Sequence, residues 1–136
     1  MTKKRILIVD DEPHVIRVMR LALEKAGYDV AEACNGNQAL EQVRANPPDL
    51  LITDLDMPQL NGRELCGRIA QEMPGRSFGI FILTARAEDE HRAWSRDMGN
   101  LDFLEKPVSI RRLLARLQQY FQHDDIGGAQ TCQQIR

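Results

Sequence analysis

The chain of 136 residues has the length of one compact domain, and 43% of its residues are hydrophobic, which favours a folded core over disorder. Its 18 basic and 20 acidic side chains leave a net charge of -2, so nonspecific binding to nucleic acid or to anionic membranes has no electrostatic driving force. The longest apolar stretches, Ile6–Val9 and Ile80–Leu83, are too short to span a bilayer. The three cysteines lack metal-binding spacing, and no signal peptide is evident. We therefore expect a cytoplasmic, reduced protein.

Short apolar runs alternate along the chain with longer segments of helical spacing. The first, third and fourth runs are almost continuously apolar, as in strands buried on both faces of a parallel sheet, whereas the second alternates and is predicted to be an edge strand. Pro13 begins and Gly27 ends the first predicted helix, and Asn35-Gly36 precedes the second. The predicted strands are Arg5–Val9, Tyr28–Glu32, Asp49–Thr53, Phe78–Leu83 and Leu101–Leu104, and the last helix is predicted over 109–122.

Five strands alternating with five helices predict an α/β fold, a doubly wound parallel sheet with right-handed crossovers. The usual strand order is 2-1-3-4-5, the flavodoxin-like arrangement, in which the site forms at the carboxyl ends of strands one and three. Residues 1–122 are predicted to form this domain. Residues 123–136 are polar and are predicted to be a disordered tail or the start of a linker.

Charged and hydroxyl side chains follow the predicted strands at this edge. Asp10-Asp11 follows the first strand, Asp54 the third, Thr84 the fourth and Lys106 the fifth. Each has an ordinary explanation alone, because Asp caps helices, Thr ends strands and Lys lies on surfaces. Two carboxylates 4 Å apart repel by about 4 kcal/mol at an effective dielectric constant near 20, so a converging cluster needs a cation. Carboxylates without His or Cys favour Mg²⁺ as the cofactor.

These residues belong to motifs that occur in a characteristic order. The chain resembles the receiver domain of two-component response regulators (CheY-like) from residue 5 to about residue 122. The spacing of the whole set is more specific than any single motif. The matching motifs are Asp10-Asp11-Glu12-Pro13, Asp54-Leu55-Asp56-Met57-Pro58 with Gly62, Leu83-Thr84-Ala85, and Phe103-Leu104-Glu105-Lys106-Pro107.

The resemblance implies that Asp54 is the phosphoacceptor. It also implies that Asp11, Asp54 and the backbone carbonyl of Asp56 bind Mg²⁺, with Asp10 contributing through water. Asp56 departs from the neutral residue that we expect at its position. Its carboxylate therefore raises the question of altered metal affinity or phosphoryl lifetime.

The same resemblance implies a conformational switch. Thr84 and Lys106 would contact the phosphoryl group, and Phe103 would occupy the aromatic switch position and turn from exposed to buried. The responsive surface would comprise the fourth helix, the fifth strand and the fifth helix, including Ala87–Met98 and Ser109–Phe121.

The implied function is that of a phosphoprotein in phosphorelay signal transduction, a regulator and not an enzyme, although it contributes to its own phosphorylation and dephosphorylation. Its partners would be a sensor histidine kinase or a histidine phosphotransfer protein, and downstream a protein target or a covalently linked output domain. The resemblance implies neither nucleic-acid nor membrane binding by this chain. It implies a monomer or a phosphorylation-dependent dimer.

Two alternatives remain open from the residues. Asp54 and Asp56 form a DxD motif, and Thr84 and Lys106 follow in the order of haloacid-dehalogenase-like phosphatases. That hypothesis leaves Asp10-Asp11 unexplained. The second alternative is a pseudo-receiver scaffold that works without phosphorylation. A flavin mononucleotide site is disfavoured, because an acidic loop after the first strand repels phosphate.

Two features of the last helices have ordinary interpretations. Trp94 and Met98 lie one turn apart and are predicted to pack together. Arg111, Arg112 and Arg116 give the last helix a basic face, which is predicted to be solvated surface.

Overall fold

The computed structural model describes residues 3–85, 93–96 and 98–127, with the side chains of 123–127 excepted. Its five strands form one parallel sheet in the order β2-β1-β3-β4-β5, which confirms the predicted flavodoxin-like α/β fold with β2 at an edge. The strands are β1 (Arg5–Val9), β2 (Asp29–Ala33), β3 (Leu50–Asp54), β4 (Gly79–Thr84) and β5 (Leu101–Glu105).

The predicted strand bounds were wrong by one residue in several places, and the backbone shows why. Tyr28 is not part of β2, because its N–H donates to the carbonyl of Leu23 and so completes the end of the first helix. Gly27 makes this possible, since its φ of +102° is a conformation that glycine adopts without strain. The C-terminal end of β3 was also predicted one residue too early, because Asp54 belongs to this strand and lies opposite Leu83 of β4.

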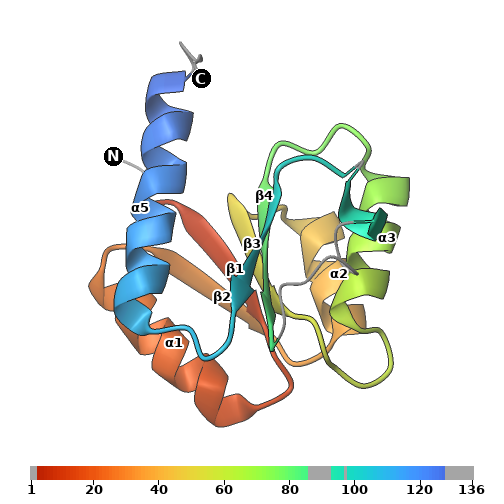
Figure 1. Ribbon diagram of the computed structural model, residues 1–136, viewed down its shortest axis with the longest axis horizontal. Coiled ribbons are helices and arrows are strands. Elements are labelled where there is room, and N and C mark those ends of the chain that lie inside the picture. The colour runs from red at the N-terminus through yellow and green to blue at the C-terminus, as the bar shows by residue number, and fades with distance from the viewer. Residues whose placement is uncertain (1–2, 86–92, 97, 128–136) are drawn as a thin grey trace.

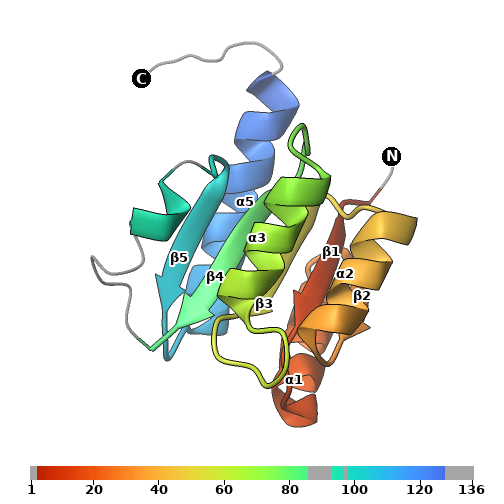
Figure 2. The same ribbon diagram turned by 90° about the vertical axis from the view of Figure 1, so that its right-hand side faces the viewer.

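Helices cover both faces of the sheet (Figures 1 and 2). Two of them, α1 and α5, lie on one face, and α2 and α3 lie on the other. Residues 93–95 are also helical, whereas 87–92 and 97 of the predicted fourth helix lie outside the described residues, as does residue 86. The bounds are α1 (Pro13–Lys25), α2 (Gly36–Ala45), α3 (Gly62–Glu72) and α5 (Ile110–Gly127).

The last helix begins one residue later than predicted and continues past 122 to Gly127. The sequence turns polar after residue 122, but polar residues still sustain the backbone hydrogen bonding of a helix. Among the side chains of α5 that the structure describes, Leu113, Leu117 and Phe121 are buried. Of the predicted tail, 128–136 lies outside the described residues.

Two hydrophobic clusters pack on opposite faces of the sheet. Successive residues of β1 alternate between them: Ile6 and Ile8 pack on the face of α1 and α5, and Leu7 and Val9 pack on the face of α2 and α3. This explains the unbroken apolar run, since both faces of a central strand are covered. Among the described helices, none is long and apolar enough to cross a membrane.

Candidate functional site

Three carboxylates converge at the carboxyl edge of the sheet. Asp10 directly follows β1 and Asp54 ends β3, and these strands are neighbours, so the crossover brings together residues 44 positions apart. One ligand oxygen from each of Asp10, Asp11 and Asp54 lies within 4.8 Å of the others. Asp11 is exposed, but Asp10 and Asp54 are only 2% and 3% exposed. The edge therefore concentrates negative charge in a largely buried position.

Lys106 supplies positive charge to this cluster. Its Nζ donates to Oδ1 of Asp54 at 2.7 Å, and the Asp54 side chain is almost fully buried there. Burial alone lowers the pKa of Lys106, but the hydrogen bond to Asp54 and the surrounding carboxylates outweigh it and raise the pKa above its usual value. The lysine is therefore held in its charged form beside the carboxylate.

Asp10 of this cluster is also affected by its surroundings. Burial raises the pKa of Asp10 above its usual value, and the negative charges of Asp54 and Asp11 add to that effect. A hydrogen bond from the backbone N–H of Glu12 to Oδ1, 2.9 Å long, opposes it, as does the charge of Lys106. Asp10 thus shapes the turn into α1 and also adds to the repulsion that a cation would relieve.

The ends of β4 and β5 are joined beside the acidic cluster. Thr84 is 3% exposed and ends β4, and its carbonyl accepts a hydrogen bond of 2.7 Å from the backbone N–H of Lys106. This bond places the start of the Lys106 side chain next to Thr84. Asp56, whose side chain is exposed, lies in the loop that follows β3.

Gly62 lets the first turn of α3 approach the acidic loop. A Cβ at this position would lie 2.6 Å from the carbonyl oxygen of Asp54 and 2.8 Å from Cα of Leu55. The N–H of Gly62 donates to the carbonyl of Leu55 at 2.8 Å. Asn61 caps the helix in a reciprocal capping box with Glu64, which orients this turn. The sequence placed Gly62 in a motif, and the structure shows its packing role.

Phe103 lies apart from the carboxylates, in the middle of β5. It is half-buried, and its ring packs edge-to-face on Trp94, with centroids 5.7 Å apart at 86°. The guanidinium of Arg63 in α3 lies 5.6 Å from the centre of the Trp94 ring. Trp94 and Met98 both pack on the cluster beneath α2 and α3. Sequence reasoning missed Arg63, because nothing in its local pattern distinguishes it from a solvated arginine.

The donor set fits a hard divalent cation. Asp10, Asp11 and Asp54 provide carboxylate oxygens, without nitrogen or sulfur ligands, in the geometry described above. Mg²⁺ prefers such oxygens together with water and phosphate, and a cation would offset the mutual repulsion of the buried carboxylates. The residues therefore suit the cofactor predicted from the sequence.

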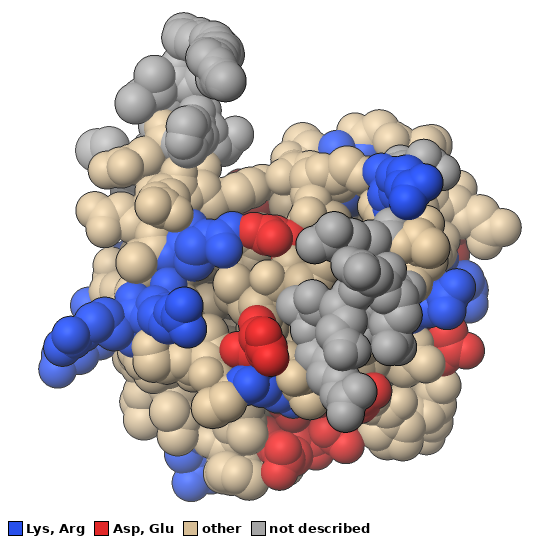
Figure 3. Space-filling view, viewed as in Figure 1, with Lys and Arg blue, Asp and Glu red and all other residues tan. Residues whose placement is uncertain are grey.

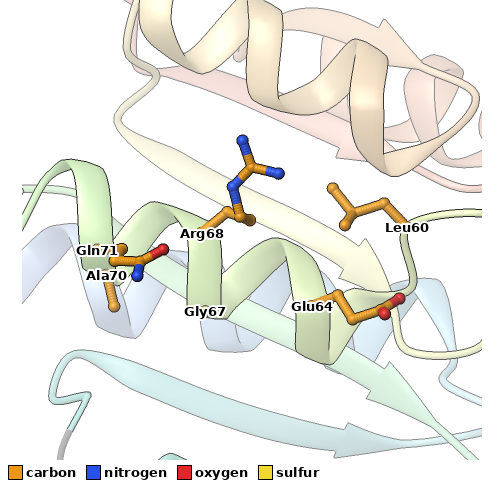
Figure 4. Close-up of a pocket in the computed structure, with 6 residues that line it drawn as sticks. All are labelled: Leu60, Glu64, Gly67, Arg68, Ala70 and Gln71. Carbon is orange, nitrogen blue, oxygen red and sulfur yellow. The ribbon is translucent and has the colours of Figure 1, made fainter.

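A shallow pocket on the outer side of α3 is separate from this cluster (Figure 4). It is open to solvent, and none of the three clustered aspartates lines it. Its charged side chains, Glu64 and Arg68, have opposite signs and lie one helical turn apart. The pocket is lined by Leu60, Glu64, Gly67, Arg68, Ala70 and Gln71.

Comparison with known proteins places the chain in one family. Residues 6–118 match the family "Response regulator receiver domain". The chain is 34% identical over 123 residues to the alkaline phosphatase synthesis transcriptional regulatory protein PhoP of Bacillus subtilis, covering 90% of this chain and 50% of the relative. It is 38% identical over 117 residues to the phosphate regulon transcriptional regulatory protein PhoB of Pseudomonas aeruginosa, covering 86% and 51% respectively.

Among solved structures, it is similar to a CheY-like response regulator receiver domain protein from Methanospirillum hungatei. The TM-score is 0.82 with 27% identity, and the match covers 91% of this chain and 98% of that one. The chain spans about half the length of the curated relatives that it matches.

Proposed function

This chain belongs to the response regulator receiver family, and from this premise we propose that Asp54 is the residue that accepts the phosphoryl group. The observation that carries the proposal is the buried Asp54 carboxylate, held 2.7 Å from Lys106 and beside Asp10 and Asp11. The membership decides against the phosphatase alternative, because receivers are phosphoacceptor signalling domains and not classical enzymes.

The chemistry needs few protein groups. An oxygen of Asp54 attacks the phosphorus atom of a phosphohistidine, so that an O–P bond forms and the P–N bond to the imidazole breaks. Asp54 reacts as the carboxylate, so a general base is not required. Phosphoryl transfer depends chiefly on positioning and on stabilisation of charge. Lys106, already directed at Asp54, would stabilise the negative oxygens as the bond forms.

The predicted cofactor fits the same cluster. Asp11, Asp54 and the backbone carbonyl of Asp56 would hold Mg²⁺, with Asp10 contributing through water. When bound, Mg²⁺ supplies positive charge to the phosphoryl oxygens. Asp10 and Asp11 would by themselves repel an incoming phosphoryl group, so their place beside the acceptor supports a metal-dependent reaction.

The product would change the contacts of Thr84 and Lys106. A phosphoryl group adds about -1.5 to -2 charge and new acceptor oxygens at this edge. Thr84 ends the adjacent strand and would donate its hydroxyl to the phosphoryl group, and its movement would let Phe103 turn inward. A partner protein would then bind the surface that includes β5, α5 and residues 93–96.

The partner upstream would be a histidine kinase, directly or through a histidine phosphotransfer protein. Downstream, the relatives named above are transcriptional regulatory proteins about twice as long as the matched region. We propose an output through either a separate protein or a linked domain. Oligomeric state belongs to the same proposal: a monomer, or a dimer that forms on phosphorylation.

Acetyl phosphate with Mg²⁺ tests the acceptor. Intact-mass spectrometry should show one added phosphoryl group in the wild type and none in Asp54→Asn, which keeps the shape of the side chain but removes its charge. Asp29→Asn, an exposed aspartate at the start of β2, is the matched control and should label like the wild type. Equal labelling of Asp54→Asn would refute the assignment. A wild type that never labels would favour the pseudo-receiver.

A further inference from the structure

Arg63, in the first turn of α3, lies over the ring of Trp94, with its guanidinium 5.6 Å from the ring centre. α3 carries two arginines, Arg63 and Arg68, and both are exposed. Figure 3 shows blue Lys and Arg side chains on the right, the side on which Figure 1 places α3, apart from those over α5. No carboxylate of the described residues forms an ion pair with Arg63. The ring of Trp94 is therefore the contact that orients this guanidinium.

Helix stability does not account for an arginine at this place. The helix dipole favours negative charge in a first turn, and Glu64 already supplies it as part of the capping box. A cation over the face of an indole ring is attracted by the electrons of the ring. The charge of Arg63 is therefore stabilised by Trp94 and not by the helix that carries it.

The backbone of Arg63 is tied to the loop that follows Asp54. Its neighbour Gly62 is buried, and the N–H of Gly62 donates to the carbonyl of Leu55 at 2.8 Å. A Cβ at Gly62 would lie only 2.6 Å from the carbonyl oxygen of Asp54, which shows how closely the first turn of α3 approaches this loop. The start of the Arg63 side chain is thus fixed relative to the proposed acceptor.

The other end of the contact reaches the proposed switch residue. Trp94 packs edge-to-face on Phe103, with centroids 5.7 Å apart at 86°, and both rings pack on the hydrophobic cluster beneath α2 and α3. The energy of such a pair depends on the place of both rings, so an inward turn of Phe103 would give up this contact. A group that holds Trp94 in its position stabilises the arrangement in which Phe103 packs on it.

We propose that Arg63 is a positioning residue, which holds Trp94 against Phe103 and so opposes the inward turn of Phe103. The inference rests on the proposed function, because that turn belongs to the proposed switch. It adds a connection through α3 to the one through Thr84 at the end of β4. A cation–π contact at an exposed site changes an equilibrium by about two- to fivefold. A ligand that favours the inward position of Phe103 should therefore bind more tightly by that factor once Arg63 is replaced.

Arg63→Met tests the proposal, since it removes the charge and keeps an unbranched side chain. Arg68→Met is the matched control, because it makes the same change of charge on the same helix. The Nη2 of Arg68 donates to Oε2 of Glu72 at 3.3 Å. Arg63→Lys keeps a cation at this position and should retain most of the wild-type behaviour. Both arginines are exposed, so all three variants should fold, which urea unfolding checks.

The first measurement is made on the unmodified chain and needs no phosphoryl chemistry. Trp94 is the one tryptophan of the chain, so its fluorescence reports its own surroundings. The guanidinium of Arg63 covers part of the ring, and quenching by acrylamide should therefore increase in Arg63→Met and stay unchanged in Arg68→Met. Equal quenching of the two variants would overturn the proposal at this step.

The second measurement is the affinity for beryllofluoride with Mg²⁺, followed by fluorine NMR so that a variant without tryptophan can be compared. Arg63→Met should bind this phosphoryl mimic about two- to fivefold more tightly than the wild type, and Arg68→Met should bind it like the wild type. In a Trp94→Leu background, Arg63→Met should change the affinity no further, because the ring that it contacts is gone.

Equal affinity of the wild type and Arg63→Met would overturn the inference alone, even if urea unfolding differed between them, because the role of Arg63 would then be purely structural. The same gain in affinity with and without Trp94 would also overturn it, since the effect would not pass through the ring. A wild type that binds no beryllofluoride would overturn the acceptor proposal, and this inference with it.

Discussion

The ammonium group of Lys106 lies 2.7 Å from Oδ1 of Asp54, although the two residues are 52 positions apart in the chain. The contact joins the loop after β5 to the end of β3 across the intervening strand β4. It places a cation inside a group of carboxylates that would otherwise repel one another. The stability and the chemistry of this edge therefore depend on the same pair.

Loss of Lys106 should destabilise the metal-free chain. Lys106→Met leaves a buried carboxylate without its charged partner, which should lower the free energy of unfolding by about 1–3 kcal/mol. Asp54→Asn in the same background removes that unpaired charge and should restore much of the loss. Urea unfolding in EDTA measures the cycle. Strictly additive effects of the two substitutions would show that the pair is not coupled.

Substitution of Asp11 should weaken metal binding without lowering the stability of the metal-free chain. Asp11→Ala removes a proposed ligand and also a negative charge close to Asp10 and Asp54, a repulsion of about 1 kcal/mol if water screens it fully. The melting temperature without metal should therefore equal or exceed that of the wild type, and the rise on adding Mg²⁺ should be lost. Strong destabilisation with an undiminished response to Mg²⁺ would instead make Asp11 a structural residue.

Substitution of two glycines of α3 by alanine should change the stability of the chain in opposite directions. At Gly62 a new Cβ would overlap the backbone of Asp54 and Leu55, and the resulting overpacking should cost about 1–3 kcal/mol of stability. At Gly67 a Cβ meets nothing within 4 Å, so the higher helix propensity of alanine should add about 0.5–1 kcal/mol. Chemical denaturation compares them, and a loss of equal size at both positions would contradict the packing argument.

Trp94 should report the state of Asp54. It is the one tryptophan of the chain and packs on Phe103, so a rotation of Phe103 should change its fluorescence. Beryllofluoride with Mg²⁺ mimics the phosphoryl group and should alter the emission of the wild type but not of Asp54→Asn. Hydrogen exchange should change across residues 84–121 under the same conditions. Changes confined to the loops around Asp11 and Asp54 would rule out the switch.

Two cysteines should differ sharply in reactivity. Cys34 is exposed, whereas Cys66 is fully buried, and burial raises the pKa of the Cys66 thiol to about 12. The reactive thiolate of Cys66 is therefore scarce below that pH. Iodoacetamide at pH 8 should modify Cys34 in the native chain and Cys66 only after unfolding, as peptide mass spectrometry would show. Native modification of Cys66 at the rate of Cys34 would contradict its burial.

Local patterns were sufficient to predict the fold and the place of the site. Continuous apolar runs predicted central strands because both faces of a parallel sheet are covered, and the alternating second run predicted an edge. Since parallel strands end at one side of the sheet, the residues after each run, among them Asp10 and Asp54, were predicted to converge there. These inferences need only the spacing of apolar residues along the chain and the right-handedness of the crossover connections.

The individual contacts were decided by the tertiary structure. The direct bond between Lys106 and Asp54 and the stacking of Arg63 on Trp94 join segments that are distant in sequence. The close approach at Gly62 depends on how the loop between β3 and α3 folds back on Asp54 and Leu55. The end of α5 at Gly127 was missed because a polar stretch resembles the end of a helix in composition. The spacing of buried residues can be recognised within a single strand or helix. A contact between two elements depends on how the fold places both of them, and the sequence of either element alone does not reveal it.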